Sequence, residues 1–190
     1  MNRQKVKGRL LALVLIASAL ALASVPASRK SPEFTIYETS GKATPLSSLK
    51  GKVVVMEFLF IRSEHCLRVA QTLNKLHSEL GSRGFQPVGV VFDPPNGANA
   101  SVQSLALMVD YFKLTYPVGH SAKADVDSYL GRTGNEILNI PQIVVIDRAG
   151  MIRATSGGAG GDPRLEDENS LRNLINDLLE EGKATSPNRR

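Results

Sequence analysis

Two apolar runs, each followed by a helical pattern, constrain the fold of this chain more than any other feature. Val53 to Phe60 is almost wholly apolar, which is typical of a strand covered on both faces. From Ser63 the period changes, and apolar residues recur at helical spacing as far as Leu80. Phe85 to Phe92 is a second apolar strand, and Ser101 can cap a second helix. This alternation predicts an α/β fold with a mixed sheet between helices.

The flanking segments extend the same architecture. Phe34 to Tyr37 reads as a short strand that adds an N-terminal β extension. Pro141 to Asp147 is a later strand, which Arg148-Ala149-Gly150 turns into a hairpin. An amphipathic final helix contains Leu171 and Leu179, and Ser156 to Pro163 is expected to be a flexible loop.

Residues 1–27 have the pattern of a secretory signal peptide. Four basic residues and no acid precede the apolar stretch Leu10–Ala23, and small residues allow cleavage after Ala27. An uncleaved membrane anchor is the alternative, although spanning helices usually need about 20 apolar residues. We therefore expect an exported protein, located in the bacterial periplasm, with secreted or membrane-anchored forms as alternatives.

The remaining boundaries and the charge follow from this assignment. We expect a linker over 28–32, one domain over 33–181 and a disordered polar tail over 182–190. The formal net charge is +5, and residues 1–27 supply +4, which leaves +1 on the rest. Nucleic acid is therefore not an expected partner. A membrane is a partner only if the N-terminal segment stays uncleaved.

The only cysteine, Cys66, lies in the stretch Arg62-Ser63-Glu64-His65-Cys66 at the start of the first long helix. Export implies an oxidising compartment, but one cysteine cannot form an internal disulfide. The simplest interpretation is structural. Ser63 is then a helix N-cap, Glu64 favours the helix dipole, and Cys66 packs as a small apolar residue.

The order of the elements and three motifs resemble the thioredoxin-like redoxins. The motifs are Leu49-Lys50-Gly51-Lys52 before the first apolar strand, the Cys66 loop, and the segment from Ile140-Pro141-Gln142 to Ile146-Asp147-Arg148-Ala149-Gly150. In particular, the chain resembles exported thiol-disulfide oxidoreductases of the cytochrome-maturation type and their relatives among the alkyl hydroperoxide reductase and thiol-specific antioxidant proteins. The resemblance covers residues 33–181 and implies a thioredoxin-like three-layer sandwich, with a central mixed β-sheet flanked by helices.

The resemblance also locates the active site of the family. There the loop reads Cys-x-x-Cys, and the first cysteine attacks a disulfide while the second resolves the intermediate. The attacking position is occupied here by Ser63 and the resolving position by Cys66. A serine hydroxyl cannot take part in thiol-disulfide exchange. The site is therefore degenerate, supports at most monothiol redox chemistry, and excludes the two-cysteine reaction.

Two alternatives stay open at this stage. Peroxiredoxins resemble thioredoxins with Thr or Ser first and a peroxide-attacking cysteine second, so Ser63-x-x-Cys66 fits a one-cysteine peroxidase. Leu59 stands where that family has proline, and an ionised Glu64 would disfavour the thiolate. The other alternative is a non-enzymatic partner-binding module. In the family, the proline matching Pro141 follows a cis peptide bond and helps to hold an extended substrate beside the cysteine loop.

Two further residues are candidates for supporting roles. Glu57 lies inside the first apolar strand, where thioredoxins have a buried carboxylate that assists proton transfer. Burial would raise its pKa, whereas a polar rim or a lysine partner would keep it ordinary. His65 is either an acid or base beside Cys66 or an inert loop residue. No metal motif and no cofactor are expected, and the predicted partner is a protein thiol, a protein disulfide or a peroxide.

Overall fold

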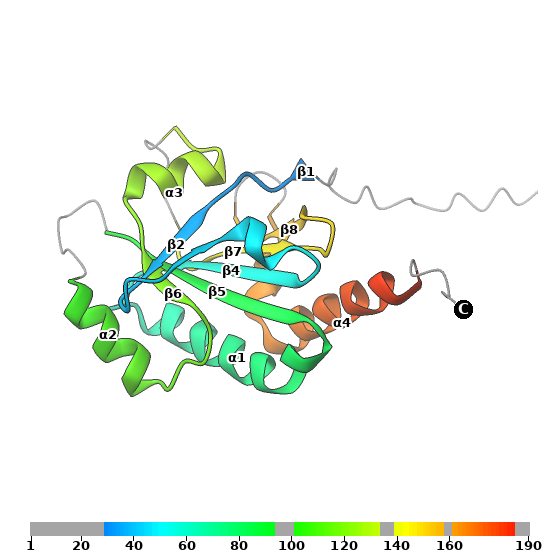
Figure 1. The fold of residues 1–190 in the computed structure, drawn as a ribbon, viewed down its shortest axis with the longest axis horizontal. Helices are drawn as coiled ribbons and strands as arrows, with labels where there is room; N and C mark the ends of the chain where they lie inside the picture. The colour runs from blue at the N-terminus through cyan, green and yellow to red at the C-terminus, as the bar shows by residue number, and fades with distance from the viewer. Residues whose placement is uncertain (1–28, 94–100, 134–138, 158–160, 185–190) are drawn as a thin grey trace, which may run out of the picture.

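A computed structural model describes residues 29–93, 101–133, 139–157 and 161–184 of the chain. The predicted signal peptide lies outside the described residues. The strands form one eight-stranded mixed sheet in the order β1-β8-β7-β4-β5-β6-β2-β3 (Figure 1). Their bounds are β1 Arg29–Lys30, β2 Thr35–Glu38, β3 Ala43–Pro45, β4 Val53–Leu59, β5 Phe85–Val91, β6 Val118–His120, β7 Gln142–Ile146 and β8 Met151–Thr155.

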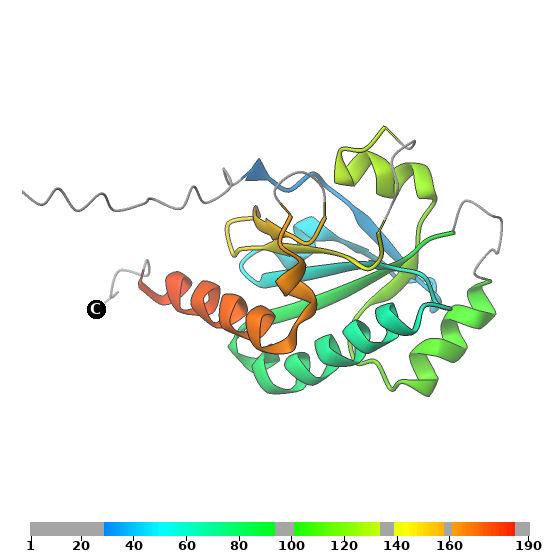
Figure 2. The same cartoon turned by 180° about the vertical axis from the view of Figure 1, so that it is seen from behind.

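Helices cover both faces of this sheet. They are α1 Glu64–Leu80, α2 Val102–Tyr111, α3 Lys123–Leu130 and α4 Glu168–Ala184, with short 3₁₀ turns η1 Leu46–Leu49, η2 Gly81–Arg83 and η3 Pro163–Glu166. Figures 1 and 2 show α1 and α4 on one face and α3 on the other. The predicted three-layer sandwich is therefore confirmed. None of the described helices has the length and apolar composition needed to span a membrane.

Strand β4 occupies the centre and divides the core into two clusters. It pairs in parallel with β5 and antiparallel with β7, so every residue of the strand is buried. Because successive side chains point to opposite faces, Val53, Val55 and Leu59 pack under α1 and α4, whereas Val54, Met56 and Phe58 pack on the α3 side. Glu57 falls in the first set, so its carboxyl points into the core beneath α1.

The N-terminal boundary differs from the prediction. Arg29 and Lys30, expected in a linker, form β1 and pair with Ile152 and Met151 of β8. The edge of β8 presents unpaired backbone groups, and the passing chain satisfies them. This pairing joins the two ends of the described domain, which no local pattern in residues 28–32 could indicate.

One C-terminal prediction is also corrected. Helix α4 reaches Ala184, three residues into the segment expected to be a polar tail. Once Leu178 and Leu179 are anchored in the core, each added residue extends an existing helix at little cost. The end of the predicted flexible loop forms η3, which Asp162 caps by accepting a hydrogen bond from the Arg164 backbone. Residues 158–160 of that loop lie outside the described residues.

Candidate functional site

The N-terminus of α1 follows directly from the sequence around Ser63. This residue is extended, and its hydroxyl oxygen accepts a long, 3.4 Å hydrogen bond from the Cys66 backbone N–H, as a helix N-cap does. Glu64 is the acidic residue of the first turn, where it complements the helix dipole. Its side chain is 93% exposed and lies 3.9 Å from the Arg68 guanidinium. Glu64 therefore points to solvent and not toward the thiol.

Cys66 lies in the core. Its relative exposure is 0%, it is a free cysteine, and it belongs to the same apolar cluster as Val69 and Leu73. Burial raises the pKa of the Cys66 thiol, hydrogen bonds from Ser63 and Phe60 partly oppose the shift, and the charge of Glu57 adds to it. The thiol is therefore held protonated and shielded, the opposite of the exposed thiolate of a reactive cysteine.

Glu57 is the most unusual side chain in the described structure. It is completely buried, and within the described part of the chain neither carboxylate oxygen has a hydrogen-bond partner. Burial raises the pKa of the Glu57 carboxyl well above its ordinary value, and the charge of Glu166 raises it further. The expected alternatives of a polar rim or a lysine partner are thus wrong. Glu57 is a neutral buried acid beneath the N-terminal half of α1.

Two neighbours of Glu57 were not identified from the sequence. Tyr116 is buried, and its hydroxyl donates a 3.1 Å hydrogen bond to the carbonyl of Ala70 in α1. Burial raises the pKa of Tyr116 well above its ordinary value, with the charge of Glu57 as a second cause. Glu166 belongs to η3, the turn that precedes α4, and it is close enough to Glu57 for its charge to raise the pKa of that carboxyl. Both come from distant segments that carry no local motif.

His65 pairs with Glu166 and not with Cys66. Its Nε2 lies 2.7 Å from a Glu166 carboxylate oxygen, and the His65 side chain is 48% exposed. The imidazole therefore links the start of α1 to η3 at the surface. Among the described residues, the contact of the imidazole is thus with Glu166 and not with the thiol.

The Ile140–Pro141 peptide bond is cis, the geometry that the resemblance implies at this position. Pro141 is buried and directly precedes β7, in which Gln142 pairs with Phe58 of β4. The antiparallel register brings Pro141 to the end of β4 from which the Ser63 loop departs. The cis proline and the N-terminus of α1 therefore lie at the same end of the central strands, where β4 ends and β7 begins.

An open apolar hollow lies beside this loop. Its volume is about 440 Å³, and its walls include Ile61 and Arg62 from the loop and Leu107, Met108, Tyr111 and Phe112 from α2. Leu107 is 64% exposed and Tyr111 is 78% exposed. We call this feature the α2 hollow. Large exposed apolar side chains beside a concave surface mark a place where another molecule can bind.

Comparison with known proteins places this geometry in a family. Residues 27–155 match the AhpC/TSA family. A search of curated proteins found no match. A putative protein disulfide isomerase from Bacteroides thetaiotaomicron is similar at 27% identity, covering 82% of this chain and 91% of that protein with a TM-score of 0.63.

Two further solved structures share the fold at lower identity. A thiol:disulfide interchange protein of the thioredoxin family from Chlorobium tepidum is 20% identical, covering 80% of this chain and 97% of that chain at a TM-score of 0.65. A secreted disulfide oxidoreductase from Mycobacterium tuberculosis is 17% identical over 76% of this chain and 96% of that chain, at a TM-score of 0.58. The match and the shared fold agree with the order of elements around Ser63 and Pro141, and the chain belongs to the AhpC/TSA family of thioredoxin-like redoxins.

Proposed function

We propose that this protein is an exported redoxin-fold binding module that holds an extended segment of a partner protein and does not exchange disulfides with it. The complete burial of the Cys66 thiol behind the Ser63 cap carries this proposal. In this protein the position that would meet a substrate presents a hydroxyl, and the sulfur lies underneath.

The chemistry of the site argues against turnover. Thiol-disulfide exchange begins with attack by a thiolate, and the residue at the attacking position, Ser63, has no sulfur. Cys66 could act alone only if it were ionised and accessible, as a peroxide-reactive cysteine must be. Instead burial raises the pKa of its thiol. Both the monothiol and the peroxidase alternatives are therefore disfavoured.

The surroundings of the site favour binding. Pro141 and the N-terminus of α1 lie at the same end of the central strands. The loop just before α1 lines the α2 hollow, in which Leu107 and Tyr111 are exposed. An extended peptide can place apolar side chains in such a hollow while its backbone contacts the loop. The names of similar structures, an interchange protein and a putative disulfide isomerase, support a protein partner that carries thiols or disulfides.

The first experiment tests the absence of redox chemistry. Native full-length protein should resist alkylation by iodoacetamide at pH 8 and should not reduce the disulfides of insulin, whereas unfolded protein should be labelled at Cys66. Ser63→Cys should create reductase activity, because it restores the missing sulfur above an intact Cys66. Labelling of the native thiol, or insulin reduction by the unmodified protein, would contradict the proposal.

The second experiment tests binding. A reduced and alkylated unfolded polypeptide is a suitable probe, because it offers extended apolar segments and no free thiol. Leu107→Ser and Tyr111→Ser should each weaken its binding by about tenfold, the loss of roughly 1.4 kcal/mol from one apolar contact. Val102→Ser is the matched control, because Val102 is 64% exposed on the same helix but does not line the α2 hollow. Cys66→Ser should leave binding intact, and equal loss from Val102→Ser would count against the hollow.

Export rests on the signal-like pattern of residues 1–27 and on the secreted nature of one structural relative. Expression in a Gram-negative host followed by osmotic shock tests it. Mature protein beginning at Ser28 should appear in the periplasmic fraction. Full-length protein in the membrane fraction would support the uncleaved anchor, and full-length protein in the cytoplasm would overturn export.

A further inference from the structure

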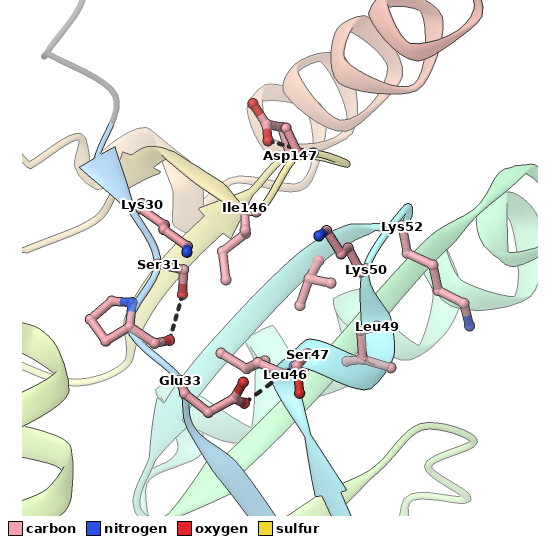
Figure 3. Close-up of a pocket in the computed structure, with 14 residues that line it drawn as sticks. Lys30, Ser31, Glu33, Leu46, Ser47, Leu49, Lys50, Lys52, Ile146 and Asp147 are labelled. Atoms are coloured by element: carbon pink, nitrogen blue, oxygen red, sulfur yellow. Dashed lines mark hydrogen bonds between the residues drawn. The ribbon is translucent and has the colours of Figure 1, made fainter. Parts of the chain in front are cut away.

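A second hollow lies at the opposite end of the sheet, where β4 begins. Its volume is about 230 Å³, and Figure 3 shows its lining side chains. Its walls come from β1, the turn η1, the start of β4 and the turn between β7 and β8. Because the Ser63 loop follows the other end of β4, this hollow is separate from the candidate site. We call it the lysine hollow.

The floor of the lysine hollow is apolar. It is formed by Leu46 and Leu49 from η1, Val54 from β4 and Ile146 from β7. In Figure 3 the Leu46 and Ile146 side chains point into the space between β1 and η1. The floor belongs to the core cluster on the α3 side, so an apolar ligand group would extend an existing core. A strongly hydrated ligand gains nothing from such a floor.

Two lysines stand on opposite sides of this floor. Lys30 and Lys50 direct their ammonium groups toward the hollow (Figure 3), and among the described residues neither side chain has a hydrogen bond or ion pair. Lys52 differs, because it turns away and donates a 2.9 Å hydrogen bond to Gln86. The rim therefore offers two unpaired positive charges that can meet one anionic group.

The acids at the rim already have partners. Glu33 accepts backbone hydrogen bonds from Phe34 at 3.1 Å and Ser47 at 3.2 Å. Asp147 accepts a 2.9 Å hydrogen bond from the Ala149 backbone and lies 3.3 Å from the Arg153 guanidinium. Asp147 is balanced by Arg153, whereas Glu33 keeps its negative charge because its partners are neutral backbone groups. Lys30 and Lys50 together still leave an excess positive charge at the hollow.

The backbone around the hollow has few free donors. The N–H groups of Ser31, Gly51 and Lys52 donate to the carbonyls of Gly150, Arg148 and Leu49 at 2.9, 3.1 and 3.1 Å. Phosphate and sulfate are usually bound by several free backbone N–H groups, which this hollow lacks. A carboxylate needs fewer donors and makes charge-assisted hydrogen bonds with ammonium groups.

We propose that the lysine hollow binds a small amphipathic carboxylate, with its hydrocarbon part on the Leu46, Val54 and Ile146 floor and its carboxylate between Lys30 and Lys50. The size of the hollow agrees with this class, because 230 Å³ lies somewhat below the roughly 300–1,000 Å³ typical of drug-sized ligand sites. A medium-chain fatty acid fits such a volume, and an inorganic anion would leave the floor uncovered. This site does not depend on the function proposed for the Ser63 loop.

Octanoate is the probe that tests this assignment on the full-length protein. Titration followed by calorimetry and by NMR should give one saturable site, with the largest methyl shifts at Leu46, Leu49 and Val54. The double variant Lys30→Gln/Lys50→Gln should weaken binding by on the order of tenfold or more, since both ammonium partners are lost. Each single variant should have a smaller effect. Lys42→Gln, which changes an exposed lysine outside the hollow, should bind as the unmodified protein does.

Other probes separate the remaining explanations. Octan-1-ol and octylamine should bind far more weakly than octanoate, because they cannot satisfy the two lysines. Inorganic phosphate that binds as tightly as octanoate, and at the same residues, would overturn the amphipathic assignment. Non-saturable binding, shifts confined to residues 1–28, or equal affinity in the double variant would overturn the site itself. Thermal melts of all variants verify that the exposed lysine substitutions leave the fold intact.

Discussion

Two buried carboxylates on opposite faces of the same sheet differ in their partners. Asp127 of α3 is paired with Lys123 and lies 3.2 Å from Arg132, with a side chain that is only 10% exposed. Glu57, on the face covered by α1 and α4, is fully buried and has no hydrogen-bond partner among the described residues. Asp127 therefore has two cationic partners, whereas burial raises the pKa of the unpartnered Glu57 carboxyl.

The difference lies in the partners of the two carboxyl groups. A buried charge is tolerated when cations surround it, as they do around Asp127. An unpartnered carboxyl such as Glu57 lowers stability, and an apolar side chain would fill its place better. Glu57 nevertheless lies beside Cys66, where the resemblance puts the proton-transfer acid of thioredoxins. The resemblance thus gives both residues a counterpart in the family site, whereas Ser63 stands at the position of its attacking cysteine.

The largest expected effect comes from breaking the compensated site. Asp127→Ala should lower the free energy of unfolding by about 3 kcal/mol, because it removes a buried anion that contacts both Lys123 and Arg132. The estimate is at the low end for buried pairs, since Lys123 is 26% exposed. Urea unfolding measures the change. Asp125→Ala, at an exposed acid of the same helix, should change stability by no more than about 0.5 kcal/mol. Equal stability of both variants would show that the pairing contributes nothing.

The opposite sign is expected at Glu57. Glu57→Leu should raise the free energy of unfolding at pH 7 by about 2 kcal/mol, because it removes a buried polar group that has no partner. Glu57→Gln should raise the free energy of unfolding by less than Glu57→Leu does, because the amide of glutamine is still a buried polar group. The same urea unfolding experiment measures both. A loss of stability in Glu57→Leu would mean that the carboxyl is satisfied, and the contrast with Asp127 would disappear.

The central strands and helices could be predicted because their signals are local. The apolar run of β4 and the helical period from Ser63 to Leu80 each lie within one segment, so period alone identifies them. The pairing of β1 with β8 could not be predicted, because two residues carry no periodicity and the partner strand lies at the far end of the domain. Strand order is a property of tertiary packing, which single-segment patterns do not encode.

The residues of the candidate site also differ in whether the sequence could identify them. The sequence left open whether Cys66 is reactive or buried, and the structure places it in the core with Val69 and Leu73. Glu57 was identified only through the resemblance, since an acid in an apolar strand is compatible with several environments. Tyr116 and Glu166 were missed, because they reach the site from a loop and from η3. Neither lies near a motif in the sequence.

The pH dependence of stability sharpens the contrast further. The folded-state pKa of Glu57 is raised above its unfolded value, which is about 4.3 for an ordinary Glu. Above pH 4.3 the unfolded chain releases this proton while the folded protein keeps it, so stability falls as pH rises until the folded pKa is passed. One group contributes a slope of at most about 1.4 kcal/mol per pH unit. Unfolding curves from pH 4 to 8 should show this decline in the unmodified protein and its absence in Glu57→Leu. An identical slope in both proteins would assign it to other groups.

The smallest expected effect tests whether Glu166 acts on Glu57 through its charge. Glu166→Gln should lower the raised pKa of Glu57, because it removes a negative charge that disfavours the ionised carboxyl. Stability at pH 8 should then rise by about 0.5 kcal/mol. The gain should vanish when Glu166→Gln is made in the Glu57→Leu background, a double-mutant cycle that isolates the coupling. Glu64→Gln removes a neighbouring charge that is 93% exposed and should show no coupling to Glu57. Equal coupling from both variants would mean that Glu57 senses only the net charge of the surface, and its contrast with the locally paired Asp127 would then rest on burial alone.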